Sequence, residues 1–389
     1  MPIADRRDSR VTDGCGARGR TRRGANSRLV QYLIALRHSA DISADAPVKA
    51  WALSELLTPE PRILHTPLPA AMRFFRRSAA PTSSSPLSFD ELRWDHGKLR
   101  VLPCLKDDPT IDPRIPRQVS GSCFSTATPT PIEKPFVVVS VPDALALIDL
   151  PPDESRDNPR FVDYASGGAI PPGSKPTAHC YCGYQFGVFS GQLGDGAAIS
   201  LGDVINTRGE RWEVQLKGAG RTHYSRQADG RKVLRSSLRE LLASEAVHAL
   251  GIPSTRAAAL TASFETLVAR DVDYNGRIIH EKASVLTRLA PSFLRFGSFE
   301  ITIPGGPSVG QFVLVEKLLD HTSKLLGVKG RAAAFGEMVA RTARLVAEWM
   351  CVGFCHGVLN TDNMSVLGLT LDCALHLSPS SVLLDSVRS

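Results

Sequence analysis

The sequence predicts an α+β fold with two lobes, the first built mainly of strands and the second of helices. Between residues 136 and 303, short runs that are rich in β-branched residues or alternate apolar with polar residues predict strands. From residue 311 onward, apolar residues repeat at helical spacing, and a Gly- and Pro-rich break at 304–310 separates the two patterns. A chain of 389 residues, 43% of them hydrophobic, is long enough to bury a sizeable core in two lobes.

The N-terminal region, residues 1–89, has the composition of a basic leader. Eight arginines fall within the first 30 residues, and no acidic residue occurs between Glu60 and Asp90. This basic, Ser-rich, acid-poor composition predicts a mitochondrial transit peptide. A disordered leader without a targeting signal, or a translation start at Met72, would also explain it.

Charge and hydropathy argue against two classes of partner. The net charge of +7 comes largely from the leader, so the basic pI gives little reason to expect a nucleic-acid-binding protein. No run of about 18 apolar residues occurs, and we therefore expect no membrane span.

The segment before the glycine-rich region is predicted to be mixed. Residues 89–94 resemble a short helix, residues 136–141 a strand, and residues 142–150 a helix that opens with a proline. The Pro-rich residues 151–177 are predicted to form a surface linker.

A glycine-rich segment, residues 183–203, is the first stretch that suggests chemistry. It contains Gly194-Asp195-Gly196, followed by an apolar run that begins at Ala197. Glycines let backbone N–H groups approach phosphate oxygens, and successive amides can form an anion-binding nest. The same composition is typical of tight hairpin turns, and glycine density alone leaves both interpretations open.

The next predicted strand, residues 211–217, ends in a lysine. Trp212, Val214 and Leu216 alternate with polar residues, so one face of this strand should be buried. Lys217 then stands where a kinase-like fold keeps a phosphate-binding lysine, although a solvated lysine at a strand end is also common.

A helix predicted at residues 237–250 follows a cation-rich loop that contains Asp229-Gly230. Glu240 could orient Lys217, as an acidic helix residue does in kinases, or it could form a capping box with Ser237. One carboxylate cannot fully serve both roles, so its partner distinguishes the two interpretations. The predicted apolar side of this helix consists of Leu238, Leu241, Leu242, Ala246 and Leu250.

Further strands are predicted at residues 264–271, 278–289 and 293–303, and two arginines lie near their edges. A guanidinium group matches two phosphate oxygens, so Arg288 and Arg295 could hold a nucleotide. Both could equally be surface charges.

The C-terminal part contains two predicted helices, residues 311–326 and 333–354, and then a polar turn with Asp362 and Asn363. An apolar run follows the turn and ends in Asp372. Oxygen side chains suit Mg²⁺, although an ordinary hairpin loop has similar residues. The predicted core face of the second helix consists of Phe335, Met338, Val339, Ala343, Val346 and Met350.

The order of these features is more informative than any one of them. A glycine-rich loop, a strand lysine, a helix glutamate, strands, helices, an Asp-Asn turn and a final aspartate follow one another as in a protein-kinase-like fold. This order favours a site for nucleotidyl or phosphoryl transfer.

Five blocks within residues 90–372 closely resemble selenoprotein O, a family of kinase-like protein adenylyltransferases. They read YCGYQFGVFSGQLGDGAA, VQLKGAGRTHYSR, SSLRELLASEA, APSFLRFGSFE and GFCHGVLNTDNMSVLGLTLD. The resemblance implies that ATP binds in an orientation inverted relative to ordinary kinases, and that AMP is transferred to Ser, Thr or Tyr hydroxyls of proteins. It also implies a mitochondrial location, in agreement with the leader.

The resemblance also implies roles for single residues. Asp362 would accept the proton, while Asn363 and Asp372 would bind Mg²⁺, with Mn²⁺ as a possible substitute. Contacts with the phosphates would come from Lys217, Arg288 and Arg295, with Glu240 positioning Lys217. The nucleotide would also be lined by Gly194, Gly196, Ala197, Asp229 and Gly230. Many members carry Arg where this chain has Ala197, so we expect that contact to be lost or replaced by backbone.

The sequence departs from the family pattern after Asp372. The family continues with Tyr-Gly-Pro-Phe-Gly and further helical sequence, whereas this chain continues with Cys-Ala-Leu-His. We therefore expect a nucleotide-binding lobe at 90–305, the start of a helical catalytic lobe at 306–372, most of which is missing, and an aberrant tail at 373–389. An inactive nucleotide-binding fragment, a pseudokinase-type interaction protein and an ordinary protein kinase are the alternatives to an active adenylyltransferase.

Overall fold

The computed structural model describes residues 87–105, 108, 110–271 and 275–372. All of these residues belong to one compact unit, Pro67–Ser389. The predicted transit peptide falls on residues outside the described ones, as does the predicted aberrant tail at 373–389, so both stay predictions.

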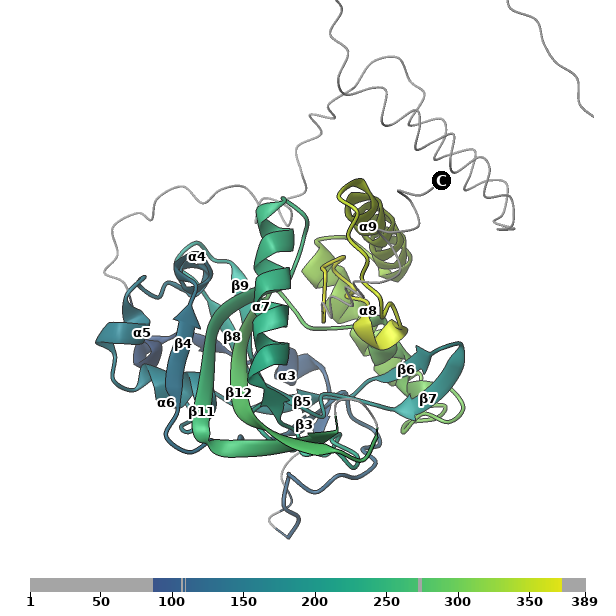
Figure 1. Ribbon diagram of the computed structural model, residues 1–389. Coiled ribbons are helices and arrows are strands. Elements are labelled where there is room, and N and C mark those ends of the chain that lie inside the picture. The colour runs from purple at the N-terminus through teal and green to yellow at the C-terminus, as the bar shows by residue number, and fades with distance from the viewer. Residues whose placement is uncertain (1–86, 106–107, 109, 272–274, 373–389) are drawn as a thin grey trace, which may run out of the picture. The chain divides into compact units, whose positions relative to one another are not determined.

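The structure is an α+β fold that contains a large mixed sheet (Figure 1). The strands follow the order β2-β3-β5-β8-β9-β12-β11-β4, with β1 paired to β8 and β10 paired to β12. Their bounds are β1 Trp94–Asp95, β2 Cys104–Leu105, β3 Phe124–Thr126, β4 Phe136–Ser140, β5 Thr177–His179, β8 Ala198–Ile205, β9 Arg211–Lys217, β10 Lys232–Val233, β11 Arg256–Asp271 and β12 Ile278–Ala290. A separate two-stranded sheet is formed by β6 (Cys182–Gln185) and β7 (Val188–Gln192).

Different helices cover the two faces of the long hairpin β11–β12. Leu260 and Leu286 pack with Leu241 of α7 (Leu234–Ala249), which contacts both strands and runs alongside the hairpin in Figure 1. The next residues, Thr261 and Thr287, point to the opposite face because side chains alternate along a strand. There both hydroxyls donate to the carbonyl oxygen of Ala165 in α6 (Phe161–Ser166), each at 3.5 Å.

The predicted strand at 211–217 is confirmed, but both of its faces are buried rather than one. Trp212, Val214 and Leu216 lie in the core, and so do Glu213 and Gln215 on the other face. Buried polar residues need partners inside the protein. The carboxylate of Glu213 is paired with the buried ammonium of Lys98, and Gln215 is bound by Arg288.

Two predicted segments have a different structure. Residues 151–177 are not a surface linker, because they form α5 (Glu154–Asp157) and α6, and α6 buries Phe161 and Tyr164 in the core. Residues 293–303 contain a 3₁₀ turn, η4 (Phe296–Thr302), instead of a strand. The Ser298 hydroxyl accepts a hydrogen bond from the backbone N–H of Arg295 at 3.1 Å, which closes this turn.

The N-terminal predictions are confirmed in part. The strand at 136–141 is β4, and the predicted helix at 142–150 consists of α4 (Pro142–Leu145) followed by a 3₁₀ turn, η3 (Ala146–Ile148). At 89–94 only the short 3₁₀ turn η2 (Phe89–Glu91) forms before β1 begins, and α3 (Gly97–Val101) follows β1.

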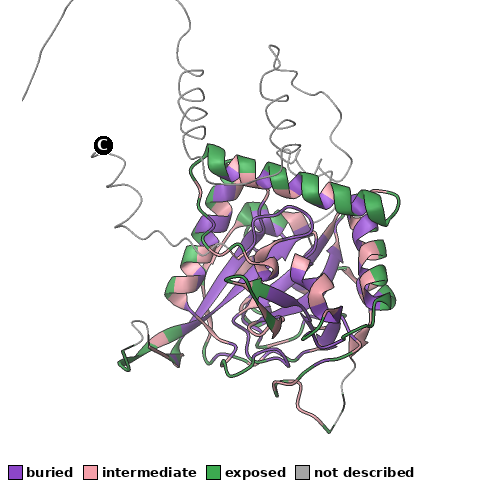
Figure 2. Cartoon of the chain, turned by 90° about the vertical axis from the view of Figure 1, so that its right-hand side faces the viewer, coloured by how far each residue is buried: buried purple, intermediate pink, exposed green. Residues whose placement is uncertain are grey.

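The two C-terminal helices, α8 (Val313–Leu326) and α9 (Arg331–Cys351), form where predicted and pack against each other. The predicted core face of α9 is wrong for most of its residues, since Phe335 is 63% exposed and Val339 53% exposed (Figure 2, the long helix near the top). It is right for Met338, which is buried, and in part for Val346, which is half-buried against the core. The buried stripe is shifted around the helix and consists of Ala334, Met338, Arg341, Leu345 and Trp349. None of the helices in the described residues is long and apolar enough to cross a membrane.

Contacts with residues 366–371 explain why this stripe faces inward. The indole N–H of Trp349 donates to the hydroxyl of Thr370 at 2.9 Å, and Gly368 lies directly against Arg341. Two neighbouring stripes of α9 carry apolar residues, so helical spacing alone does not decide between them.

Candidate active site

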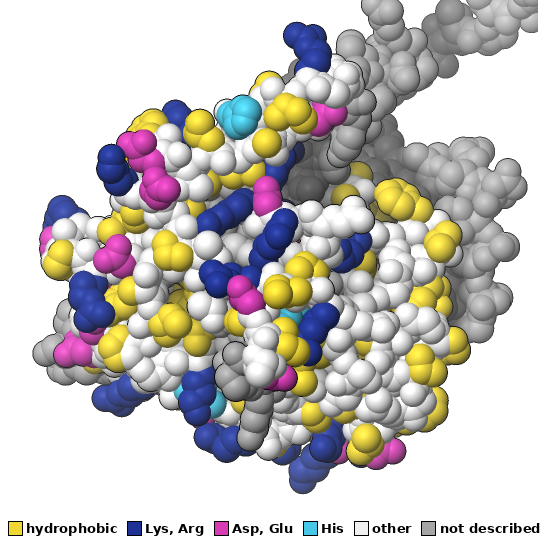
Figure 3. Space-filling model, turned by 90° about the horizontal axis from the view of Figure 1, so that it is seen from below, with side chains coloured by type: hydrophobic (Ala, Val, Ile, Leu, Met, Phe, Trp, Pro, Cys, Tyr) yellow, Lys and Arg dark blue, Asp and Glu magenta, His cyan; other side chains and the backbone are white. Residues whose placement is uncertain are grey.

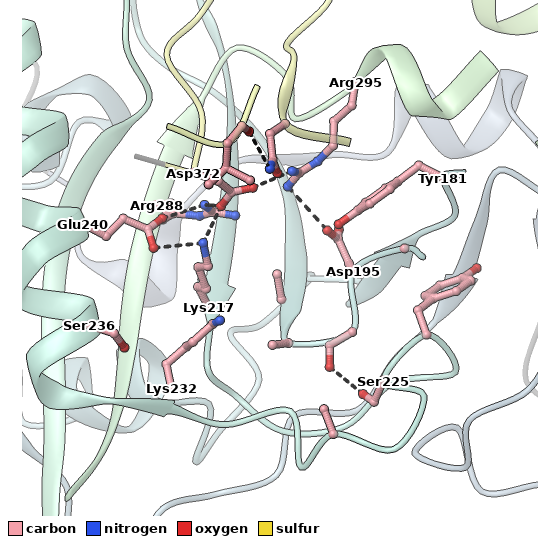
Figure 4. A pocket seen from close by; sticks show the side chains of 18 of the residues that line it. Tyr181, Asp195, Lys217, Ser225, Lys232, Ser236, Glu240, Arg288, Arg295 and Asp372 are labelled. Atoms are coloured by element: carbon pink, nitrogen blue, oxygen red, sulfur yellow. Dashed lines mark hydrogen bonds and ion pairs between the residues drawn. The ribbon is translucent and has the colours of Figure 1, made fainter. Parts of the chain in front are cut away.

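A pocket of about 450 Å³ brings together residues that are far apart in the sequence (Figure 4). Its walls come from the glycine-rich segment, β9, β10, α7, β12 and the Asp-Asn turn. This volume lies within the range of small-molecule sites, about 300–1,000 Å³. The lining residues include Gly194, Gly196, Ala197, Lys217, Glu240, Arg288, Arg295, Asn363 and Asp372.

The glycine-rich segment forms a hairpin and also lines the pocket, and its role as an anion-binding nest stays a prediction. Its first part forms the hairpin β6–β7, and its second part, Gly194 to Ala197, lines the pocket. A Cβ at Gly194 would lie 2.4 Å from the ring of Tyr224, and one at Gly196 would lie 2.6 Å from the Tyr224 carbonyl oxygen. Glycine is therefore required at both positions by close packing.

Lys217 and Glu240 form an ion pair of 2.9 Å between β9 and α7. Glu240 also accepts a hydrogen bond from Arg288 at 2.7 Å. The alternative of a capping box is wrong, because α7 begins at Leu234 and Ser237 lies inside the helix. The hydroxyl of Ser237 is instead hydrogen-bonded to Ser284 at 2.8 Å.

Asp372 is the meeting point of three cations. Its carboxylate is paired with Lys217, with Arg288 at 2.7 Å, and with Arg295. Burial alone would raise the pKa of Asp372, but the charges of Lys217, Arg295 and Arg288 outweigh burial and hold it well below its ordinary value. The carboxylate is therefore ionised at neutral pH.

The alternative that Arg288 and Arg295 are surface charges is wrong, since each side chain is only 2% exposed. The Arg295 guanidinium lies over the ring of Tyr181, 4.7 Å from its centre, and donates to the backbone carbonyl of Asp362 at 2.6 Å. Its other end lies 3.7 Å from the carboxylate of Asp195. Buried cations held in this way are oriented before any ligand arrives.

Asp362 lies in the 3₁₀ turn η5 (Thr361–Asn363) and is not among the residues that line the pocket, although its neighbour Asn363 is. Its carboxylate lies against Gly183 of the β6–β7 hairpin. One carboxylate oxygen accepts a hydrogen bond from Gln185 at 3.0 Å, and the other is buried without a hydrogen-bond partner among the described residues. Burial raises the pKa of Asp362 above its ordinary value, although the hydrogen bond from Gln185 opposes the shift. A carboxylate of this kind accepts a proton more readily than an exposed one.

The two predicted metal ligands, Asn363 and Asp372, both line the pocket. The side-chain amide of Asn363 donates to the Val358 carbonyl at 3.0 Å, which leaves its own carbonyl oxygen as an acceptor. Mg²⁺ commonly takes one or two side-chain oxygens from protein and the rest from water and phosphates, so this pair fits an ion that binds together with a nucleotide.

Asp229 and Gly230 lie beside the main pocket and not in its lining. They line an adjoining cavity of about 370 Å³, which Ala197 and Lys232 share with the main pocket. Asp229 is paired with Arg270 at 2.7 Å. A Cβ at Gly230 would lie 2.2 Å from the backbone of Gly220, so that position requires glycine.

The sequence comparisons identify a family that matches the part of the chain in which this site lies. The profile of "Protein adenylyltransferase SelO" matches residues 112–374, more than half of the chain. This chain belongs to the SelO family. The resemblance noted from short blocks of sequence is thereby confirmed over the pocket, β9, α7 and the Asp-Asn turn.

Curated SelO relatives occur in animals and bacteria. The mouse protein adenylyltransferase SelO, mitochondrial, is 50% identical over 317 residues, which cover 76% of this chain and 47% of that protein. The human protein of the same name is 49% identical over 316 residues, again 76% of this chain and 47% of the relative. A protein nucleotidyltransferase YdiU from Aromatoleum aromaticum is 49% identical over 279 residues, 69% of this chain and 52% of that protein. The chain thus spans about half the length of these curated relatives.

Four pocket or neighbouring residues of this SelO-family chain were missed as functional candidates. Asp195 lies between Gly194 and Gly196, which the sequence predicts to line the nucleotide, but the sequence does not show that the Asp195 side chain is buried. Lys232 was visible only as one of several loop cations. The others, Tyr181 and Gln185, contact Arg295 and Asp362, and their sequence context gave no signal of these contacts.

Proposed function

We propose that this chain is an ATP-dependent protein adenylyltransferase that transfers AMP to Ser, Thr or Tyr hydroxyls of proteins. The observation that carries the proposal is the convergence of Lys217, Arg288 and Arg295 on Asp372 within one pocket. The names of the SelO and YdiU relatives, protein adenylyltransferase and protein nucleotidyltransferase, support the same class of reaction.

The charge of the pocket suits a nucleoside triphosphate. Six cationic side chains and three carboxylates line it, so it carries an excess of positive charge. Lys217, Arg288 and Arg295 would contact phosphate oxygens, because buried guanidinium and ammonium groups form strong charge-assisted hydrogen bonds with them. Glu240 would keep Lys217 and Arg288 in place when the carboxylate of Asp372 binds a metal ion instead of these cations.

In the proposed transfer step, Asp362 acts as the base. The hydroxyl oxygen of the acceptor protein forms a bond with the α-phosphorus, and the bond to the β-phosphate oxygen breaks, which releases pyrophosphate. The hydroxyl proton passes to the carboxylate of Asp362, whose raised pKa suits a general base. Mg²⁺, held by Asn363 and Asp372, would supply charge neutralisation on the phosphates. The ATP orientation required for AMP transfer is part of this proposal.

A protein-kinase type of fold is also part of the proposal. The order β5, glycine-rich insertion, β8, β9 with Lys217, and α7 with Glu240 corresponds to the order of the phosphate-binding elements in kinases. The division into lobes at 90–305 and 306–372 belongs to the same proposal.

We propose a mitochondrial location and protein partners. Relatives from mouse and human are named as mitochondrial, and the basic leader of this chain has the composition of a transit peptide. Nucleic acid is not an expected partner, and on the face seen in Figure 3 the Lys and Arg side chains are interspersed with Asp and Glu.

Label transfer from ATP carrying ³²P in its α-phosphate tests the proposal. The full chain, Mg²⁺ and a mixed protein extract as acceptor should give labelled protein, and Asp362→Ala should abolish the label while nucleotide binding largely survives. Asp320→Ala, an exposed aspartate of α8 outside the pocket, should leave the label unchanged. Undiminished transfer by Asp362→Ala would contradict the assignment of the base.

A further inference from the structure

Lys232 is a cation of the pocket to which no role has been given. It lies in the short strand β10, where its backbone pairs with Ser284 of β12. Its half-buried side chain lies near that of Lys217, and both residues line the pocket (Figure 4).

The surroundings of Lys232 differ from those of the other buried cations. Lys217, Arg288 and Arg295 each form ion pairs with a carboxylate of the pocket. Among residues 87–105, 108, 110–271 and 275–372, no carboxylate forms an ion pair with Lys232. Its charge is therefore not matched at close range within the described part of the chain.

The neighbourhood disfavours this charge when the pocket holds no anion. The charge of Lys217, followed by burial, lowers the pKa of Lys232 below its ordinary value, although Glu240 and Asp372 oppose the shift. Two ammonium groups that share a half-buried space repel each other, and an anion placed between them would remove the repulsion. Lys232 is thus arranged for a ligand with several negative charges.

Ala197 and Lys232 lie where the main pocket meets the adjoining cavity. Both residues line the main pocket and the adjoining cavity, and Ala197 contributes only a methyl group there. Lys232 can therefore reach a ligand at this junction, and it lines both cavities, whereas Arg221, Arg231 and Arg270 line the adjoining cavity but not the main pocket.

We propose that Lys232 is a further ligand for the phosphate chain of a nucleoside polyphosphate, bound where the two cavities meet. This inference rests on the proposed function, because it places ATP in the main pocket. Lys232 would contact phosphate oxygens directly, and its contribution should increase with the number of phosphates on the nucleotide.

Nucleotide titrations of the full-length Lys232→Met variant test the inference. We expect the dissociation constant for ATP to rise about 10-fold, as for loss of one charge-assisted hydrogen bond. The rise should be smaller for ADP and AMP, and adenosine binding should be unchanged. Lys324→Met, which removes an exposed lysine of α8 outside the pocket, is the matched control and should bind ATP as the unmodified chain does.

A second variant distinguishes a ligand contact from a structural effect. Adding Ala197→Arg to Lys232→Met places a new cation at the same junction and should recover most of the lost ATP affinity. Because Lys232→Met removes a repulsion, its melting temperature without nucleotide should be no lower than that of the unmodified chain.

The outcomes separate the two proposals. If the unmodified chain binds ATP and Lys232→Met binds it equally well, or loses ATP and adenosine affinity to the same extent, the inference about Lys232 is wrong and the proposed function stands. If the unmodified chain itself binds no ATP, both are wrong.

Discussion

The carboxylate of Glu240 lies 2.9 Å from the ammonium of Lys217, and this ion pair joins α7 to the end of β9. Burial opposes ionisation of Glu240, but Lys217 and Arg288 lower its pKa below the ordinary value, so it is charged at neutral pH. Glu240 therefore balances two of the cations that we assign to the phosphates.

Glu240→Gln should weaken both the fold and nucleotide binding. The variant replaces two charge-assisted contacts by weaker ones, so we expect a loss of about 1–3 kcal/mol in the free energy of unfolding. ATP affinity should fall about 10-fold because Lys217 and Arg288 are no longer held in place. Denaturant unfolding and nucleotide titration measure these effects. The control is Glu245→Gln on the same helix, whose partner Arg256 lies outside the pocket. It should lose stability but keep ATP affinity, and equal losses of affinity in both variants would contradict the account.

Gly183→Ala should impair transfer more than it impairs nucleotide binding. The new Cβ would lie 2.6 Å from a carboxylate oxygen of Asp362 and 2.7 Å from Leu193, so the hairpin or the carboxylate must shift. A displacement of about 1 Å at a reacting group can lower the rate about 100-fold. Initial rates of label transfer and ATP titrations separate the two effects.

The matched control is Gly336→Ala in α9, where a Cβ meets no atom within 4 Å. That change should stabilise the helix by about 0.5–1 kcal/mol and leave transfer unchanged. A normal transfer rate in Gly183→Ala would show that Asp362 is not held in its working position by the hairpin.

Asp195 should make stability depend on pH. Burial raises the pKa of this carboxyl from 3.8 to about 6, against the opposing charges of Arg295 and Arg288. Between these two pH values the folded chain retains a proton that the unfolded chain has lost, so stability falls as the pH rises through this interval and levels off above it. The difference corresponds to about 3 kcal/mol.

Asp195→Asn removes this titration while keeping an oxygen acceptor. We expect the stability of the variant relative to the unmodified chain to increase between pH 4 and pH 7, by at most about 3 kcal/mol. Other titrating groups are common to both proteins and largely cancel. Urea unfolding at several pH values measures the difference, and a difference independent of pH would rule out a raised pKa at Asp195.

The orientation of α9 predicts opposite outcomes for two neighbouring apolar residues. Met338 is 5% exposed, so Met338→Ser should cost about 2–5 kcal/mol, as for other large-to-small core changes. Phe335 is 63% exposed, so Phe335→Ser should change stability by about 0.5 kcal/mol or less. Denaturant unfolding of both variants is the measurement, and a larger loss for Phe335→Ser would support the face expected from the sequence pattern.

Some elements of this fold are decided by a local sequence pattern and could be predicted, whereas others are decided by tertiary contacts and could not. Strand β9 and the position of Lys217 could be predicted because alternation of apolar residues is a local signal. The partner of Glu240 could not, because it depends on where α7 begins. That start is set by Val233, which pairs with β12 and places Ser237 inside the helix.

The sequence also does not reveal which charged side chains are buried. Arg288 follows an ordinary strand pattern, and only the fold reveals that its guanidinium is buried between Glu240, Asp372 and Gln215. The face of α9 was likewise decided by contacts of Trp349 and Arg341 with residues 368–370, which helical spacing does not contain.

The position of the transferred label tests the central proposal most directly. Parallel reactions of the full chain use ATP labelled with ³²P in the α-phosphate or in the γ-phosphate, with the same protein acceptor and Mg²⁺. AMP transfer predicts labelled protein from α-labelled ATP alone. Label from γ-labelled ATP alone would contradict the proposal in favour of a protein kinase, and no label from either nucleotide would contradict it in favour of an inactive nucleotide-binding chain.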